Sequence, residues 1–170
     1  MDVMTDRFSG RVLRGLNGEE PQPALGEIGL SQFAPYLMNR IMSRWNAHLS
    51  ETLREADMTT TKMRALAVLS LAPSLTINEL SVYAVTEQST MSRTLDSLEE
   101  QGFIRRQPRA EDMRIRDVAI TEEGRAAFET VWPAMYDLLQ HLFDGIDDAE
   151  YAGFIAILHK ILRNIHKHEI

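Results

Sequence analysis

Short hydroxyl side chains and one arginine collect on one side of the segment 86–101, TEQSTMSRTLDSLEEQ. At 100° per residue, Met91, Leu95 and Leu98 share one face of a helix, and that face must meet a core. The opposite face and its flanks carry Ser89, Thr90, Ser92 and Arg93. Short donors let a helix approach the major groove of DNA closely, and arginine can pair with guanine through two hydrogen bonds. This face therefore predicts contacts with nucleic acid.

The alternative interpretation of the same helix is a solvent-exposed face that happens to be rich in serine and threonine. Both residues are mediocre helix formers, so an exposed helix without a function would more often carry Glu, Lys and Ala. The helix alone leaves both interpretations open.

A basic strip follows this helix, because residues 103–116 hold five arginines and two acidic residues. The alternating segments FIRRQ and IRDVAI, joined by PRAEDMR, predict a β-hairpin. Its turn would place Arg109, Asp112 and Arg114 beyond the paired strands, and a narrow minor groove attracts inserted arginine. Asp112 suits such a tip only if it pairs with and orients a neighbouring arginine. The alternative is an ordinary polar turn with surface ion pairs of about 0–1 kcal/mol each.

The net charge of −7 does not exclude a nucleic-acid partner. A binding surface depends on where the basic groups lie and not on their total. The acid excess lies mainly at the carboxyl end, where residues 117–170 hold ten acidic and four basic side chains. The middle of the chain therefore keeps its locally basic strip.

The length of 170 residues favours one domain with a single sizeable core. No cysteine is present, which excludes disulfides and thiol chemistry. The apolar runs are far shorter than the roughly 20 residues that a membrane span needs. Together with the lack of an apolar secretory signal, these features predict a cytoplasmic protein.

Helical periodicity and end signals predict a mainly α-helical chain around the hairpin. The first helix begins near Ser31 or at Pro35, and its apolar face is wider than one partner helix would cover. Thr121 caps a long helix that should bend at Pro133. The expected helices span 31–55, 60–71, 76–84 with a capping box of Thr76 and Glu79, 87–101 ending before Gly102, 121–143, and 147–165 capped by Asp147.

The stretches INELSVYAVTEQSTMSRTLDSLEEQGFIRR and EDMRIRDVAITEEGR closely resemble the winged helix-turn-helix of the MarR (multiple antibiotic resistance regulator) transcription factors. The family's wing pattern falls on Asp112, Arg114, Val118, Ile120, Thr121 and Gly124. Ile120 replaces the usual leucine, and Met113 stands where arginine or glycine is more common. The resemblance covers about residues 31–165, and the flanking helices match by layout more than by motif.

The resemblance implies a winged helix-turn-helix flanked by amino- and carboxyl-terminal dimerisation helices. Residues 58–120 would bind DNA, 30–57 and 121–170 would interleave with a second copy in one intertwined domain, and 1–29 would form a flexible arm. The wide apolar faces of the first and last helices agree with an obligate homodimer. Two-fold symmetry would set the recognition helices about 34–36 Å apart on a pseudo-palindromic double-stranded operator. The expected DNA-binding residues are Ser89, Thr90, Ser92, Arg93, Arg109, Asp112 and Arg114.

The resemblance also implies a repressor of nearby genes that a small aromatic or phenolic ligand releases from DNA. Methionine tolerates varied ligand shapes, tryptophan offers a stacking surface, and arginine can hold a carboxylate. The candidate ligand-binding residues are Met38, Met42, Trp45, Met63 and Arg64. The alternative is that these apolar residues belong to the core.

Other classes of function find less support in the sequence. No glycine-rich phosphate loop, nucleophile elbow, zinc-protease helix or cysteine nucleophile is present, so we expect no enzyme, cofactor or resident metal. A zinc-responsive regulator is one alternative, with the candidate ligands His141, Asp144, His159, His166 and His168. A winged-helix module that binds only proteins is another.

Overall fold

The computed structural model describes residues 29–109 and 112–168, without the side chains of Asp112, of 114–115 and of 166–168. Contacts divide the chain into two compact units between Glu55 and Ala56. All of the predicted arm except Gly29 lies outside the described residues. The division into an arm, a dimerisation region and a DNA-binding region stays a prediction.

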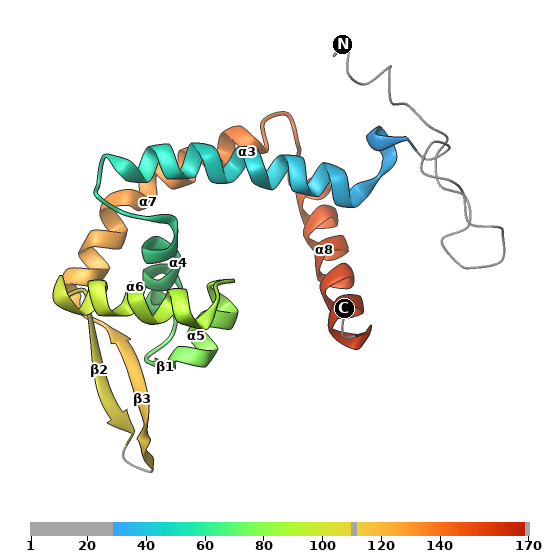
Figure 1. Ribbon diagram of the computed structural model, residues 1–170. Helices are drawn as coiled ribbons and strands as arrows, with labels where there is room; N and C mark the ends of the chain where they lie inside the picture. Colours follow the sequence, from blue (N-terminus) through green and yellow to red (C-terminus); the bar gives the residue numbers. More distant parts are fainter. Residues whose placement is uncertain (1–28, 110–111, 169–170) are drawn as a thin grey trace. The chain divides into compact units, whose positions relative to one another are not determined.

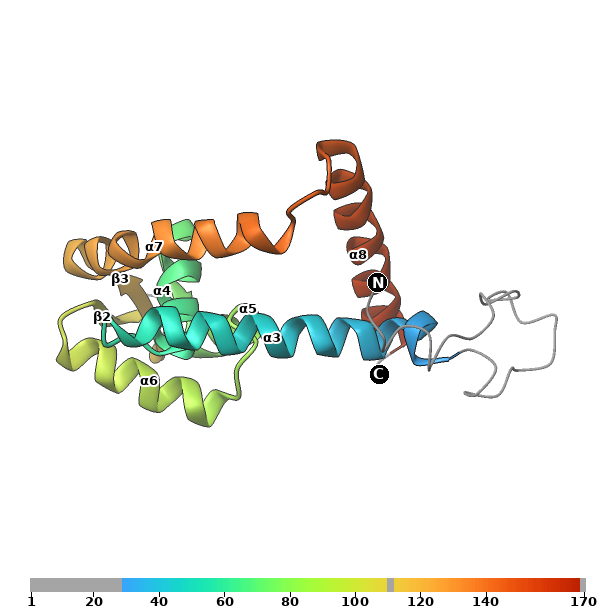
Figure 2. The same ribbon diagram turned by 90° about the horizontal axis from the view of Figure 1, so that it is seen from above.

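The described part of the first unit is a short 3-10 helix, η1 (Leu30–Gln32), followed by the long helix α3 (Ala34–Arg54), shown in Figures 1 and 2. Pro35 lies in the first turn of α3, where its missing N–H breaks no helical hydrogen bond. The predicted start at Pro35 is therefore confirmed. The alternative start at Ser31 is wrong, because Ser31 lies within η1 and Phe33 occupies the N-cap.

The second unit begins with α4 (Thr60–Leu71), the short strand β1 (Leu75–Thr76) and α5 (Ile77–Tyr83). The predicted capping box at the start of α5 is confirmed. The Thr76 hydroxyl accepts from the backbone N–H of Glu79 at 3.3 Å, and the Glu79 carboxylate accepts from the N–H of Thr76 at 2.8 Å. These two bonds satisfy backbone donors that a helix start leaves unpaired.

Helix α6 (Gln88–Glu100) follows, and its predicted core face is confirmed because Met91, Leu95 and Leu98 are fully buried. The helix ends at Gly102, whose φ of +74° suits glycine. The N–H of Phe103 donates to the carbonyl of Leu98 at 2.9 Å, which closes the last turn. The recognition-type helix therefore has a fixed inner face and a fixed end.

The hairpin consists of β2 (Ile104–Arg109) and β3 (Asp112–Ile120), and it extends beyond α6 in Figure 1. With β1 it forms an antiparallel sheet in the order β1-β3-β2. The predicted hairpin is confirmed, but the strands run further than expected. Arg109 pairs with Asp112 inside the ladder, so neither residue lies beyond the paired strands.

Pro108 explains why the sequence suggested an earlier turn. Proline removes one ladder hydrogen bond, and it is tolerated here because β2 lies at the edge of the sheet. The register shifts between Pro108 and Arg109, and pairing then continues. The strand β1 was not predicted, because its two residues also serve as the approach to α5 and are too few to show alternation.

Helix α7 (Glu122–Leu142) leaves the sheet at its predicted cap, where the Thr121 hydroxyl accepts from the N–H of Gly124 at 3.0 Å. The same hydroxyl donates to the carbonyl of Gly102 at 2.7 Å. A Cβ on Gly124 would overlap the backbone carbonyl of Phe103, so only glycine fits this crossing. Pro133 lies inside α7, and the ribbon of α7 curves in Figure 1.

Helix α8 (Asp148–His168) begins at its predicted cap. The Asp147 carboxylate accepts from the N–H groups of Ala149 and Glu150 at 2.9 and 2.8 Å. Within the part of the chain that the structure describes, no helix has the length and hydropathy that crossing a membrane requires.

The core of the second unit lies where α4 packs against α5, α6, α7 and β3. Its apolar side chains are almost entirely shielded from solvent. They include Met63, Ala65, Leu66, Leu69, Leu80, Met91, Leu95, Leu98, Ile104 and Val118. This core fixes α6 and the hairpin as one rigid frame.

Candidate nucleic-acid interface

The outer face of α6 presents the side chains that the sequence singled out. Ser89, Thr90 and Arg93 are exposed, and Ser92 is half-buried. Among the described residues, the Arg93 guanidinium has no hydrogen-bond or ion-pair partner. Its donors are therefore available to an external acceptor, and a guanine edge or a phosphate offers one.

Arg106 on β2 ties the hairpin to the back of α6. Its Nη1 donates to Oδ1 of Asp96 at 2.8 Å, and its Nε lies 3.7 Å from Oε2 of Glu99, an ion-pair distance beyond hydrogen-bond length. Its Nη2 also donates to the carbonyl of Ser92 at 3.4 Å. Only 17% of the Arg106 side chain is exposed. Arg106 therefore fixes the angle between α6 and the wing.

Sequence reasoning did not assign this role to Arg106. It placed Asp96 and Glu99 on turns of α6 that a duplex would not reach, without a partner for either. The available signal was their spacing, because residues three apart share a helix face. Their partner lies 7 to 10 positions later on another element, which a local pattern does not reveal.

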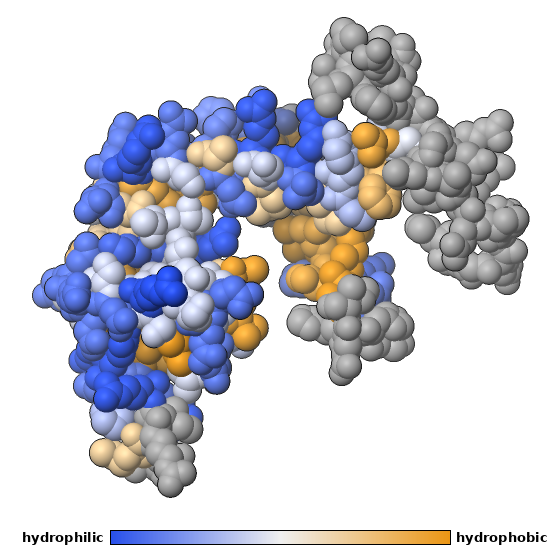
Figure 3. Space-filling view, viewed as in Figure 1, coloured by the Kyte–Doolittle hydropathy of each residue, from blue (hydrophilic) through white to orange (hydrophobic). Residues whose placement is uncertain are grey.

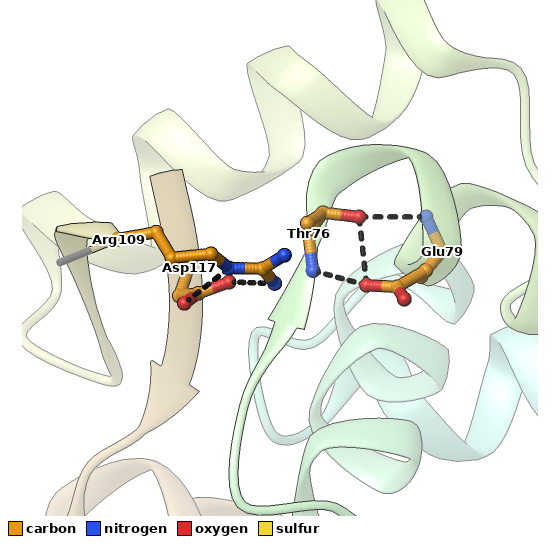
Figure 4. Close-up of polar contacts among 4 residues, drawn as sticks. All are labelled: Thr76, Glu79, Arg109 and Asp117. Atoms are coloured by element: carbon orange, nitrogen blue, oxygen red, sulfur yellow. Dashed lines mark hydrogen bonds and ion pairs between the residues drawn. The ribbon is translucent and has the colours of Figure 1, made fainter. Parts of the chain in front are cut away.

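Arg109 forms a second internal pair, shown in Figure 4. Its Nε and Nη2 donate to the two carboxylate oxygens of Asp117 at 3.1 and 2.6 Å. This forked geometry uses both sides of the planar guanidinium. The hydrogen bonds lower the pKa of the Asp117 carboxyl group below its ordinary value.

The pair of Arg109 and Asp117 lies beside the start of α5. Thr76 is the register partner of Asp117 across β1 and β3, and Figure 4 shows the two bonded pairs next to each other. The hydrogen bond from the Thr76 backbone lowers the pKa of the Glu79 carboxyl group, the Thr76 hydroxyl adds to this, and the charge of Arg109 acts in the same direction. The wing is thus tied to the helix-turn-helix at two points.

The arginines of the wing therefore fall into two groups. Arg106 and Arg109 are held by carboxylates of the same chain. Arg105 and Arg116 are exposed, and neither has a partner among the described residues. Arg114 lies in β3, but its side chain and that of Asp112 are outside the described part. The predicted DNA contact of Arg109 must compete with Asp117 for the same guanidinium.

A cleft of about 540 Å³ opens between the hairpin, α6 and the start of α5. Across it, the Gln88 amide donates to Oδ1 of Asn78 at 2.7 Å. The lining residues are Thr76, Ile77, Asn78, Gln88, Leu95, Arg106, Arg116 and Val118. Sequence reasoning missed this cleft, because its walls come from separate elements.

The predicted ligand-binding residues belong to different units. Met38 and Met42 on α3 are 36% and 46% exposed, and Trp45 is half-buried. Met63 is buried at 4% exposure in the core of the second unit, as the alternative interpretation expected. Arg64 is half-buried. That these residues line one pocket stays a prediction.

The predicted zinc ligands receive no support from the described side chains. Nδ1 of His141 lies 2.7 Å from the carbonyl of Asp137, and His159 is exposed. No group of three His, Cys, Asp or Glu residues within the described ranges is arranged to hold a metal ion. The side chains of His166 and His168 lie outside those ranges.

Comparisons with known proteins agree on one family. The MarR family model matches residues 56–115. A crystal structure of a MarR-family transcriptional regulator from Silicibacter pomeroyi is 45% identical, with a TM-score of 0.80, over 87% of this chain and 100% of that one. A mutant of Escherichia coli MarR in complex with operator DNA is 26% identical, with a TM-score of 0.67, over 75% and 92%. The HTH-type transcriptional repressor IacR of Pseudomonas putida is 26% identical over 84% of this chain and 86% of its own length.

Proposed function

We propose, from the fact that this chain belongs to the MarR family of transcriptional regulators, that it is a homodimeric repressor of nearby genes. The repressor role is supported by the similarity to the P. putida repressor. DNA binding by the winged unit is supported by the similarity to a MarR protein in complex with its operator. The single observation that carries the proposal is the exposed outer face of α6, where Arg93 has no partner among the described residues.

The first turns of α6 would enter the major groove. Arg93 would pair with a guanine, while the short hydroxyls of Ser89 and Thr90 would contact base edges or phosphates. Arg114 on the wing would reach the neighbouring minor groove. Arg106 would keep the two contacts at a fixed angle, which is needed for both to form at once.

The homodimer is supported by apolar faces that a single chain leaves uncovered. Figure 3 shows apolar side chains gathered on α8. The exposed members on this helix are Tyr151, Phe154, Ile157, Leu162 and Ile165, and those on α3 are Leu37, Met38, Ile41 and Met42. A second copy would bury them, because such large patches rarely stay open on a monomer. Its two-fold axis would place two α6 helices about 34–36 Å apart.

We also propose that a small aromatic or phenolic ligand weakens DNA binding and relieves repression. Met38, Met42, Trp45, Met63 and Arg64 remain the candidate contacts. A coupling of about 1–3 kcal/mol between ligand and DNA would suffice for release. A regulator of this kind acts where the genomic DNA lies, which supports the predicted cytoplasmic location.

The proposal is tested by selecting bound sequences from a random pool of duplexes. The affinity for the selected duplex is then measured by fluorescence anisotropy from about 50 to about 200 mM salt. We expect a two-fold symmetric consensus, a steep loss of affinity with salt, and a preference of at least about a thousandfold over mixed-sequence DNA. A protein-interaction module would select no sequence, and that result would contradict the proposal.

A further inference from the structure

The cleft between the wing and α6 contains one arginine that the fold does not use. In β3, residues that alternate along the strand face the same side of the sheet, and Arg116 shares its side with Val118. The buried Val118 lines the cleft together with Arg116. Arg106 also lines it, but its charge is matched by Asp96 and Glu99. Among the described residues, Arg116 is therefore the cation of the cleft without a carboxylate partner.

The opposite wall of the cleft offers amide donors to the same space. Because Oδ1 of Asn78 accepts from Gln88, the Asn78 amide group keeps both of its N–H donors available. The Gln88 amide group uses one N–H in this bond and keeps the other. By contrast, the Thr76 hydroxyl donates to Glu79 at 2.8 Å and so adds no free donor. One guanidinium and two amide groups make a site for an anion that accepts several hydrogen bonds.

The position of the cleft indicates which anion this is. In duplex DNA, one sugar–phosphate strand separates each major groove from the neighbouring minor groove. If α6 lies in a major groove and the wing reaches the next minor groove, that strand must pass between them. We propose that this cleft holds the DNA backbone between the two grooves, with Arg116 paired to a phosphate and the amides of Asn78 and Gln88 contacting the same strand. This inference rests on the proposed DNA binding and assigns it a backbone-holding residue.

A phosphate contact has a different signature from a base contact. It weakens binding to all sequences alike, and it lowers the slope of log affinity against log salt by about 0.9 for each phosphate released. A dimer with two clefts would lose about 1.8 in slope when both arginines are removed. Arg93, if it reads a base, would instead change the ratio between specific and mixed-sequence DNA.

The test compares Arg116→Ala with Arg105→Ala as a matched control. Arg105 is an exposed arginine of the same hairpin, its register partner is Ala119, and it does not line the cleft. The probes are a mixed-sequence duplex of about three helical turns and the selected duplex, each measured by anisotropy across a salt series. We expect Arg116→Ala to weaken both by an equal factor of about ten or more and to reduce the slope. We expect Arg105→Ala to change both quantities much less.

Further variants separate the inference from the proposed function. Arg116→Lys keeps the charge and should recover most of the slope, and Asn78→Ala should weaken both duplexes equally. A wild-type slope in Arg116→Ala, or equal losses in Arg116→Ala and Arg105→Ala, would overturn the cleft assignment while leaving DNA binding intact. Failure of the wild-type protein to bind either duplex would overturn the proposed function itself. A thermal melt of each variant confirms that the fold is kept.

Discussion

The winged part of the second unit and helix α8 bury their apolar side chains to very different extents. Leu66, Leu80 and Leu95 are fully shielded, whereas Phe154, Ile157 and Leu162 on α8 are 40–55% exposed. Both regions are rich in apolar residues and have well-formed helix caps. The winged part therefore completes its own core, while α8 has an apolar face that only another surface can cover. We infer that folding of the wing and pairing of two chains are separable properties.

The largest expected effect comes from the core of the winged part. Leu66→Ala removes a fully buried side chain and leaves a cavity. We expect the free energy of unfolding to fall by about 2–5 kcal/mol. Urea denaturation measures this, and Leu71→Ala provides the control because Leu71 is 89% exposed on the same helix. Similar losses in both variants would show that the core has been misplaced.

The crossing of Gly124 over Phe103 should give the next effect. Gly124→Ala forces a methyl group into the backbone carbonyl of Phe103, so the base of the wing must shift. We expect a loss of about 1–3 kcal/mol in unfolding free energy and weaker DNA binding. Gly153→Ala on α8 is the matched control, since nothing lies near its added Cβ, and it should be neutral or slightly stabilising. A neutral Gly124→Ala would contradict the close approach.

Helix α8 should respond in assembly and not in the stability of the single chain. Ile157→Asp places a charge on the face that we expect a second copy to cover. We expect dimerisation to weaken at least about tenfold, since burying an unpaired carboxylate is costly. Analytical ultracentrifugation over a concentration series measures this shift. Ala156→Asp, also exposed on α8, tests whether the effect is specific to the apolar face.

The smallest effect concerns the ion pair at the wing. Asp117 has a lowered pKa in the folded protein, so its contribution is present above the unfolded pKa and is lost as the pH falls through the folded value. Stability should therefore decrease on acidification below the ordinary pKa of aspartate. Asp117→Asn should flatten this part of the stability-versus-pH profile. An unchanged profile, measured by thermal melts from about pH 7 to about pH 3, would show that Asp117 carries no such contribution.

Elements with local hydrogen bonds could be predicted from the sequence. The caps at Thr76, Thr121 and Asp147 depend on residues a few positions away, and each forms as expected. The buried face of α6 followed from helical spacing alone. These features rest on short-range geometry, which the order of residues determines directly.

The pairing of the wing arginines could not be predicted, because it depends on which elements meet in space. Arg106 reaches back to α6, and Arg109 reaches across the hairpin to Asp117 on β3. A composition count treats all five arginines of 103–116 as equal, although two of them hold the frame together. The cleft at Arg116 was missed for the same reason. Tertiary contacts therefore decide which charges remain for a partner.

The central claim, that α6 reads DNA sequence through Arg93, is tested most directly by one comparison. The affinity of Arg93→Ala is measured for the selected duplex and for duplexes with single base substitutions in each half-site. We expect the variant to lose about 1–3 kcal/mol at one symmetric base pair and to stop discriminating there. An equal loss on all duplexes, or no loss on any, would contradict base reading by Arg93.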